Sequence, residues 1–418
     1  MNILITNITQ LLTLSGPKRA RIGNEMRNPG IIENAALYIE DEKIKFFGKE
    51  RDVLDKIRNR KHINIRANGV VMPAFIDTHT HSVFARPRLE DFEMRTNGLS
   101  YLEIKKRGGG INLSARQIKN SSDDVLFDNL LYFSKKFIEC GTTVIEVKSG
   151  YGLDFENEIK ILNTIKKAKA YTKLDMIPTF LGAHSVPDGF KDSKEYLKYL
   201  KKEVLPYVAK NKLAVFADIF CEKGYFSVEE SIDYLNFAKK FGLKPRIHAE
   251  QMSRFGGCVA AYKTKAISAD HLDWADKSYV ELLKKSKTTA VFLPASNYFT
   301  GAKKYPDARI FIDNGAKVVI STDFNPGTSP CWNMQFVISA SVNYMKMKIE
   351  EAIYASTYNA SCLLGLHKRV GMIESGMDAD VIIMEVKDYR EIAYYFGSNL
   401  NRMTIKRGNI IYEKGNSV

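Results

Sequence analysis

Histidines and acidic residues follow several short apolar runs of this sequence, and these residue types suggest metal-assisted chemistry. His79 and His81 follow the run 70–76 and are separated by one residue, Thr80. In an extended chain, residues two apart point to the same side, about 7 Å apart at the backbone, so both imidazoles can reach one cation. Zinc and ferrous iron bind imidazole nitrogen and carboxylate oxygen at roughly 2.0–2.2 Å, and His248 and Asp323 are able to complete such a shell. We therefore expect one divalent metal per chain, either zinc or iron.

The remaining histidines decide between this interpretation and a simpler one, because a lone His-x-His pair is more often a surface or hydrogen-bonded feature. Five of the seven histidines follow or end an apolar run; beyond the pair these are His184, His248 and His271. In a barrel of parallel strands the carboxyl ends meet at one rim, where such enzymes carry their chemistry. This placement favours the metal site.

The elements that must position these residues alternate between short runs rich in Val and Ile and longer amphipathic segments. That alternation is typical of βα units whose parallel sheet is buried on both faces. Eight runs predict strands: 70–76, 142–148, 174–184, 213–222, 243–249, 266–272, 290–297 and 317–323. Helices are expected between them, for example over 123–139, 155–170, 227–241 and 276–285. Eight alternations in about 250 residues favour a (β/α)₈ TIM barrel over an open doubly wound sheet, and the runs lack a glycine-rich dinucleotide fingerprint.

Both ends of the chain contain short β segments that do not belong to this alternation. They cover 1–6, 35–39 and 43–47 at one end and 380–385, 403–406 and 410–413 at the other. We predict an α/β protein of two domains: a small composite β-sandwich domain from residues 1–68 and 369–418, and a barrel domain from residues 69–368.

Composition and charge limit the classes of partner that we expect for this protein. The net charge of +14 is spread over lysine pairs on the expected helix backs and forms no basic block interleaved with aromatics, so we expect no nucleic-acid partner. The sequence has neither a basic leader nor an apolar run of 18 residues, so we expect no membrane association. Five widely spaced cysteines without a CxxC pair fit a reducing compartment, and we expect a cytoplasmic protein.

Several motifs resemble those of the amidohydrolase superfamily, whose mark is His-x-His after strand one, His after strands five and six, and Asp after strand eight. Within it, the sequence is most similar to the imidazolonepropionase family, and the likeness spans nearly the whole chain. The motifs that carry it are Pro73-Ala74-Phe75-Ile76-Asp77-Thr78-His79-Thr80-His81, Gly108-Gly109-Gly110-Ile111, Lys148-Ser149-Gly150-Tyr151-Gly152, Thr179-Phe180-Leu181-Gly182-Ala183-His184 and Thr322-Asp323-Phe324-Asn325-Pro326-Gly327.

The resemblance implies hydrolysis of the ring amide of 4-imidazolone-5-propanoate to N-formimidoyl-L-glutamate in histidine degradation, by a homodimer. It makes His79, His81, His248 and Asp323 the metal ligands. It also implies substrate contacts from Arg88, Tyr151, His184, Gln251 and Thr328, with Asn325 and Gly327 at the product. Some relatives have glutamate where Gln251 stands; a carboxamide cannot accept a proton, so Gln251 can orient the ring but cannot be the general base.

Three residues are predicted to be catalytic. A divalent ion lowers the pKa of bound water towards about 7, and Asp323 and His271 are the candidates to take the proton and pass it to the leaving nitrogen. His184 is the candidate to donate to the carbonyl oxygen. The simpler interpretations are that His271 is a buried hydrogen-bonded histidine and that His184 only holds a loop.

Arg88 and Tyr151 also have simpler interpretations, and Lys148 bears on the number of metal ions. Arg88 suits a carboxylate because a guanidinium grips it with two parallel hydrogen bonds, although a surface ion pair with Glu90 or Asp91 is the alternative. Tyr151 lies between two glycines and either covers the pocket or only packs. Lys148 ends strand two rather than strand four, which disfavours a carbamylated two-metal site, and Glu222 offers a simpler hydrogen-bonding role.

Two competing functions remain open at this point. A purine or pyrimidine deaminase would use similar metal ligands but would have little need for Arg88 facing a carboxylate. A non-catalytic scaffold on the same barrel should have lost metal ligands, and the sequence retains all of them.

Overall fold

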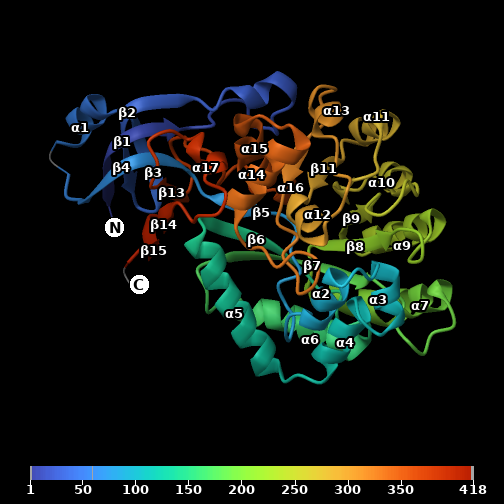
Figure 1. Ribbon diagram of the computed structural model, residues 1–418. Helices are drawn as coiled ribbons and strands as arrows, with labels where there is room; N and C mark the ends of the chain where they lie inside the picture. Colours follow the sequence, from blue (N-terminus) through green and yellow to red (C-terminus); the bar gives the residue numbers. More distant parts are fainter. Residues whose placement is uncertain (1, 59, 416–418) are drawn as a thin grey trace.

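The computed structural model describes residues 2–58 and 60–415, whose strands form two sheets (Figure 1). The larger sheet has eight parallel strands that neighbour one another in chain order. They are β5 (Phe75–Asp77), β6 (Thr142–Lys148), β7 (Asp175–Ala183), β8 (Phe216–Cys221), β9 (Lys244–Ala249), β10 (Ser268–His271), β11 (Thr289–Phe292) and β12 (Val318–Ile320). This arrangement confirms the predicted (β/α)₈ barrel, because consecutive parallel strands with intervening helices form it.

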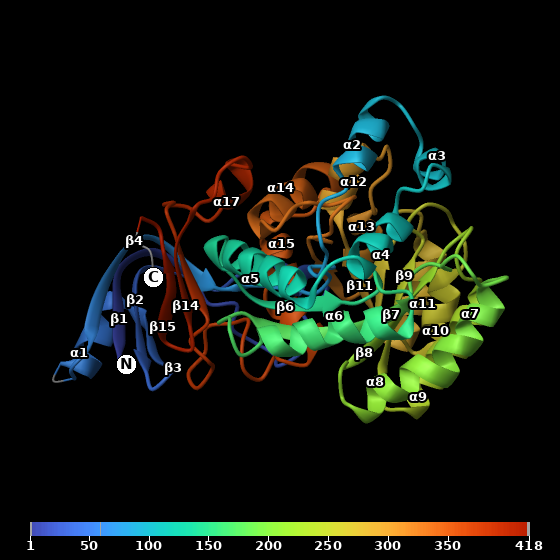
Figure 2. The ribbon, with the colours of Figure 1, turned by 90° about the horizontal axis from the view of Figure 1, so that it is seen from below.

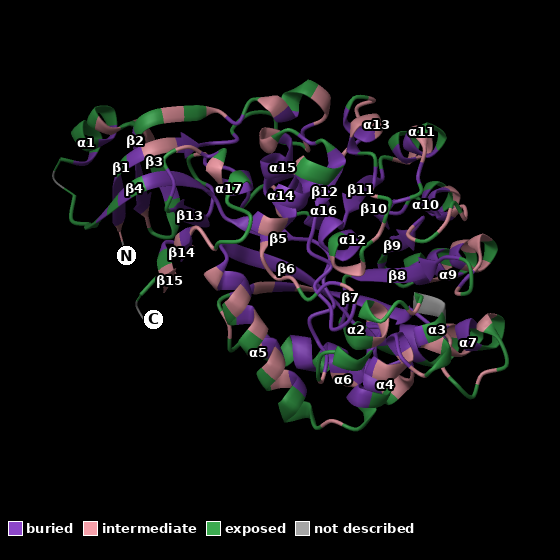
Figure 3. Ribbon diagram, in the orientation of Figure 1, coloured by how far each residue is buried: buried purple, intermediate pink, exposed green. Residues whose placement is uncertain are grey.

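Helices cover the outside of the barrel, and their buried faces explain why these segments are helical. In α5 (Asp123–Glu139) the apolar residues Leu126, Leu130 and Phe137 recur at helical spacing and are buried, while the opposite side is exposed (Figure 3). Ser122 caps this helix by accepting a hydrogen bond from the backbone N–H of Val125. The expected helices over 123–139, 155–170, 227–241 and 276–285 are confirmed, with ends shifted by one or two residues.

Further helices follow the barrel strands. In the first half of the barrel they are α2 (Leu89–Thr96), α3 (Tyr101–Lys106), α4 (Ile111–Lys119), α6 (Phe155–Ala168), α7 (Ser193–Tyr199), the π-helical turn η2 (Leu200–Val204), α8 (Leu205–Lys210) and α9 (Val228–Lys240). Those of the second half are α10 (Gly257–Thr264), α11 (Lys277–Ser286), α12 (Pro294–Thr300), α13 (Ala308–Ile312), α14 (Met334–Met345), α15 (Ile349–Ala355) and α16 (Tyr358–Leu364).

The two ends of the chain build the second sheet together, as Figure 2 shows by the blue and red strands side by side. Its seven strands lie in the order β15-β14-β13-β4-β1-β2-β3, and only the pair β1–β4 is parallel. The elements are β1 (Ile3–Leu12), η1 (Gly23–Arg27), β2 (Ile31–Glu40), β3 (Lys43–Lys49), α1 (Glu50–Ile57), β4 (Ile63–Pro73), β13 (Val381–Met384), α17 (Glu391–Tyr394), β14 (Asn401–Lys406) and β15 (Asn409–Glu413). The predicted composite domain is confirmed as one mixed sheet.

Most predicted barrel strands are observed with ends shifted by up to three residues, and two differ more. The run 70–76 is divided, because Val70 and Val71 pair with β13 of the small sheet while β5 begins only at Phe75. Strand β4 therefore extends beyond the boundary predicted at residue 68. The run 290–297 ends as a strand at Phe292, since Pro294 begins α12 and a proline has no N–H for the ladder.

Among the described residues, we find no helix that is both long and apolar enough to cross a membrane.

Candidate metal centre and substrate pocket

The barrel closes along the segments that carry three of the predicted metal ligands. Beyond the ends of β5 and β12, the His81 N–H donates to the carbonyl of Phe324 at 2.7 Å, and the Asp323 N–H donates to the carbonyl of His79 at 3.1 Å. A side-chain bond, from the Thr78 N–H to Ser321 Oγ at 3.0 Å, continues the same seam. Barrel closure therefore fixes the pair of histidines beside Asp323 independently of any bound ion.

Four side chains converge at this seam. His79, His81 and His248 each place a ring nitrogen within 4.8 Å of those of the other two. The Asp323 carboxylate lies 3.5 Å from His79 Nε2 and 3.6 Å from His81 Nε2. The Nε2 atoms of His79 and His248 are buried without a hydrogen-bond partner among the described residues. Unpaired imidazole nitrogens facing a buried carboxylate are the donor set that a divalent cation requires, so these residues fit the predicted metal.

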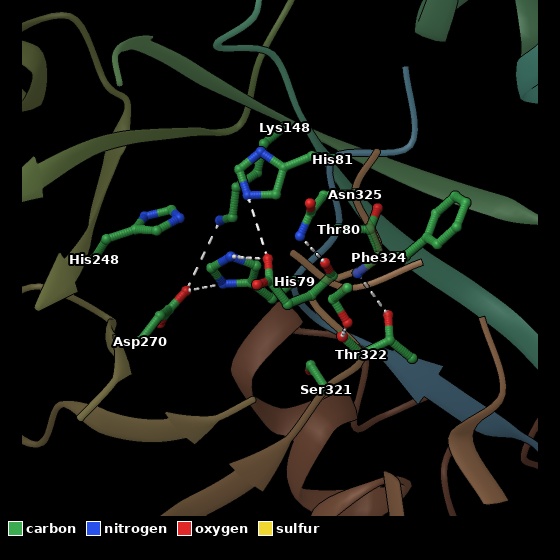
Figure 4. A network of polar contacts seen from close by, with 12 residues as sticks. His79, Thr80, His81, Lys148, His248, Asp270, Ser321, Thr322, Phe324 and Asn325 are labelled. Carbon is green, nitrogen blue, oxygen red and sulfur yellow. Dashed lines mark hydrogen bonds and ion pairs between the residues drawn. The ribbon is translucent and has the colours of Figure 1, made fainter. Parts of the chain in front are cut away.

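A buried ionic network lies behind His79 and His248, and Figure 4 shows the part in which Asp270 contacts His79 and Lys148. Asp270 Oδ2 lies 2.7 Å from His79 Nδ1, and Asp218 Oδ2 lies 3.1 Å from His248 Nδ1. Lys148 Nζ joins the two carboxylates, at 2.9 Å from Asp218 and 3.8 Å from Asp270. A carboxylate bonded to Nδ1 keeps the proton there and leaves Nε2 free for a metal, and Asp270 does this for His79. Asp218 places a negative charge beside His248 Nδ1 without a hydrogen bond. The network therefore orients His79 and supports His248 by charge.

Two further members, Glu146 and Arg246, bring this network to three carboxylates and two cations. Glu146 accepts from Lys148 at 2.9 Å, and Arg246 donates to Asp270 at 2.8 Å. Sequence reasoning missed Glu146, Asp218, Arg246 and Asp270. The available signal was a charged residue inside a buried strand, two residues from Lys148 or His248 in the case of Glu146 and Arg246, a spacing that points both side chains to the same side.

Burial sets the protonation of the histidines. It lowers the pKa of His79, His81 and His271 well below the usual range, and it lowers the pKa of His184 to about 3. All four rings are therefore neutral at pH 7, as metal binding and proton acceptance require. Burial also raises the pKa of Asp323 to about 7, a shift that a bound dication would reverse.

His184 faces the site as a hydrogen-bond acceptor. Its Nδ1 lies 2.9 Å from the carbonyl of Gly150, which can only accept, so Nδ1 carries the proton. In a neutral ring Nε2 then has a lone pair. Donation to a carbonyl oxygen, the role expected from the sequence, would require the imidazolium form, whereas acceptance from a ring N–H of a ligand requires only the neutral form. The ring stacks on that of His81 at a centroid distance of 5.1 Å.

A cavity of about 220 Å³ opens above the metal ligands. Most residues predicted to contact substrate or product line it, namely Arg88, Tyr151, His184, Gln251, Asn325 and Thr328. Gly327 lines an adjoining chamber instead. Three further residues line the cavity and were not predicted, namely Asp273, Ser296 and Asn297. Ser296 and Asn297 were missed because the sequence analysis placed them within a strand.

Two buried glutamates hold the loops that carry Tyr151 and Gln251. Glu158 accepts hydrogen bonds from the backbone N–H groups of Gly150, Gly152 and Leu153 at 2.8–3.1 Å. Glu222 accepts from the Met252 N–H at 2.9 Å, next to Gln251. The hydrogen-bonding role suggested for Glu222 from the sequence agrees with this contact.

The backbone is strained where the strands meet the pocket. Glu250, His271 and Asp323 have φ values of +56°, +80° and +55°, which residues other than glycine rarely adopt. Such conformations persist where the surroundings impose them and cluster at active sites.

Arg88 is fixed in the pocket wall rather than on the surface. Only 3% of its surface is exposed, so Arg88 is not a surface residue. The pairing with Asp91 that the alternative named is present, with Asp91 Oδ2 3.4 Å from Arg88 Nε, but it is buried. Its guanidinium lies across the Cα atom of Gly327: a Cβ there would be 1.9 Å from Arg88 Nη2. The absence of a side chain at Gly327 is what lets the guanidinium reach this position.

Gly327→Ala is therefore expected to displace the Arg88 guanidinium. Because the obstructed atoms end a flexible side chain, we expect the melting temperature to stay within about 2 °C and KM to rise about 10- to 100-fold, as for a lost charged hydrogen bond. Steady-state kinetics and thermal unfolding measure both. Gly397→Ala is the control, since nothing lies within 4 Å of a Cβ at that position. An unchanged KM would show that the guanidinium position does not matter.

The sequence profile of the Amidohydrolase family matches residues 70–411. A protein of Clostridium tetani named imidazolonepropionase is 38% identical over 99% of both chains. One of the same name from Flavobacterium johnsoniae is 40% identical over 98% of this chain and 100% of its own.

Solved structures show likeness of fold. A guanine deaminase of E. coli superimposes with a TM-score of 0.73 at 16% identity, covering 99% of this chain and 100% of that one. A triazine hydrolase variant gives a TM-score of 0.76 at 13% identity, covering 99% and 95%.

Proposed function

This chain belongs to the amidohydrolase family and, within it, to the imidazolonepropionases, and on that premise we propose that it hydrolyses 4-imidazolone-5-propanoate to N-formimidoyl-L-glutamate in histidine degradation. The observation that carries the proposal is the location of Arg88 in the wall of the cavity that opens onto the metal ligands. This geometry provides for a substrate with a ring amide at one end and a carboxylate at the other. The full-length relatives, at 34–40% identity, bear this name.

We infer that His79, His81, His248 and Asp323 hold one zinc or iron ion. Three imidazoles and one carboxylate suit either metal. When bound, such an ion supplies an activated water and polarises a carbonyl.

The protein's own residues bind and orient the substrate. Arg88 grips the propionate, Tyr151 and Thr328 border the ring, and Gln251 orients it by its carboxamide. Asn325 and Gly327 are placed to hold the opened product. The Asn325 side chain is itself fixed, because Nδ2 donates to the Asp323 carbonyl at 2.7 Å.

Proton transfer completes the reaction. Water's oxygen joins the ring carbonyl carbon, the ring C–N bond breaks, and the nitrogen gains a proton. Asp323 and His271 are the groups placed to accept the proton from water and return it to the nitrogen, while His184 Nε2 accepts from a ring N–H and holds the ring in place.

A substrate comparison tests this function. With freshly generated imidazolone propionate, the metal-loaded protein should open the ring with kcat/KM in the usual enzyme range, about 10⁴ M⁻¹s⁻¹ or more, and should not deaminate guanine or cytosine. Deamination without ring opening would support the alternative deaminase function. The deaminase likeness is one of fold alone, at 16% identity.

The proposal extends to assembly as a homodimer. Exposed aromatic side chains gather around α12, α14 and α17, namely Tyr298, Tyr344, Tyr394 and Phe396, and line a groove. Clustered exposed aromatics mark interaction surfaces, and we propose that a second copy covers them.

Light scattering measures the assembly. The double variant Tyr394→Ser, Phe396→Ser should give the mass of one chain where the parent gives two. Tyr171→Ser, at a similarly exposed tyrosine elsewhere, should leave the mass unchanged. A dimer that survives the double variant would place the interface on another surface.

We also propose a cytoplasmic location. The support is chemical: all five cysteines are free, three of them buried, as expected where thiols stay reduced.

A further inference from the structure

A smaller chamber, of about 190 Å³, adjoins the substrate pocket and shares Arg88, Thr300 and Thr328 with it. Residues of the segment between β5 and α4 form much of its wall, namely Asp91, Arg95, Leu99, Ser100 and Ile104. None of these residues has a role in the function proposed above. The chamber nevertheless shares Arg88 with the pocket in which that function requires a carboxylate.

Two guanidinium groups meet at this chamber, on either side of Gly327. Arg88 lies across the Cα atom of Gly327, and Arg95 Nη1 donates to the Gly327 carbonyl at 3.4 Å. The Arg95 side chain is held between two aromatic rings, with its guanidinium carbon 5.4 Å from the centroid of Phe92 and 4.6 Å from that of Phe299. Arg95 is therefore a positioned cation rather than a mobile surface residue.

Donor atoms of both guanidiniums are buried without a hydrogen bond. Arg95 Nη2 has no hydrogen-bond partner among the described residues, and Arg88 Nε makes only an ion-pair contact with Asp91, at 3.4 Å. Buried polar atoms are almost always paired, so donors that the protein leaves unpaired indicate where a ligand supplies the acceptors. Arg88, being almost fully buried and lining both cavities, connects these donors with the substrate pocket.

The charges of the chamber do not cancel. Its one carboxylate, Asp91, lies 3.4 Å from Arg88 Nε and accepts from the Gly110 N–H at 2.9 Å. Burial and the neighbouring Arg88 lower the pKa of Arg95, as expected for two cations held close together with one anion between them. A further anion would restore the balance.

We propose that this chamber is a carboxylate subsite in which Arg95 and Arg88 together bind the propionate group of the substrate. Arg95 is then a specificity-determining residue that selects anionic substrates, an inference that rests on the function proposed above. Planar guanidiniums suit this ligand because each can offer two parallel N–H groups to a carboxylate.

The test compares an acid with its neutral amide. Binding of 3-(imidazol-4-yl)propanoate, an inert carboxylate, and of its carboxamide is measured by calorimetry on the metal-loaded protein. The parent should bind the acid more tightly. Arg95→Met should weaken acid binding about 10- to 100-fold and leave amide binding within about threefold. In ring-opening kinetics the same variant should raise KM by a similar factor with little change in kcat.

Two variants keep the result interpretable. Arg60→Met is the matched control, because Arg60 also lies against two aromatic rings, those of Tyr38 and Phe46. Both rings belong to the small sheet, so this variant should leave acid and amide binding unchanged. Arg95→Lys keeps the charge and should restore part of the preference for the acid. Equal loss of acid and amide binding in Arg95→Met, or no loss of either, would overturn the subsite.

Failure of the underlying function gives a different pattern. If the parent protein does not open the imidazolone ring, the proposed function is wrong. A preference for the acid that disappears in Arg95→Met would still establish the subsite for another carboxylate substrate.

Discussion

Asp323→Asn is expected to lower kcat/KM for ring opening by at least about 10³-fold, the largest effect that we predict for one substitution. The carboxylate has two proposed tasks, metal ligation and proton acceptance. It lies 3.5–3.6 Å from the Nε2 atoms of His79 and His81. A carboxamide of the same shape neither accepts a proton nor contributes a negative charge, and general base catalysis alone is worth about 10²–10⁴-fold.

The measurement is kcat/KM together with metal content per chain. Asp128→Asn, at an exposed aspartate of α5, is the matched control and should retain parental activity. Activity within tenfold of the parent in Asp323→Asn would contradict both tasks at once. Lost activity with full metal content would restrict Asp323 to proton transfer.

The second large effect is expected at Lys148, which touches neither substrate nor the proposed metal. Its buried ammonium lies among Glu146, Asp218 and Asp270. Lys148→Met leaves three carboxylates with only Arg246 to neutralise them. Removing one partner of a buried ionic network costs about 3–5 kcal/mol of stability, and loss of support behind ligating histidines lowers metal affinity about 10- to 100-fold.

Denaturant unfolding and a chelator competition measure these two effects separately. Lys166→Met, at an exposed lysine of α6, should change neither. The decisive observation is the metal affinity of folded Lys148→Met protein. If it equals that of the parent, the network stabilises the barrel without orienting the ligands. If it falls, Lys148 is a positioning residue.

The sequence allowed the barrel and its rim to be predicted because each strand carries its signal locally. An apolar run followed by histidine or aspartate marks both a buried strand and its functional end, and barrel geometry brings those ends together. His79, His81, His248 and Asp323 are separated by up to 244 residues, yet their position after strands was sufficient to group them.

The features that could not be predicted from the sequence depend on contacts between distant segments, which no local pattern specifies. We assigned Val70 and Val71 to a barrel strand, whereas they pair with β13 of the small sheet. A buried apolar run does not reveal which sheet it joins. Arg88 fits against Gly327 only because the segment before α2 packs on the loop after β12. The same packing leaves Arg95 Nη2 without a hydrogen-bond partner in the described part of the chain. Even the proton position on His184 follows from one carbonyl, that of Gly150, supplied by another strand's loop.

Locating the ion by anomalous X-ray scattering, on crystals of protein loaded with zinc or iron, tests the central claim most directly. The account predicts one peak, bound by the Nε2 atoms of His79, His81 and His248 and by the Asp323 carboxylate, at ligand distances of about 2.0–2.2 Å. A peak elsewhere, or none in crystals of protein that remains active, would contradict it.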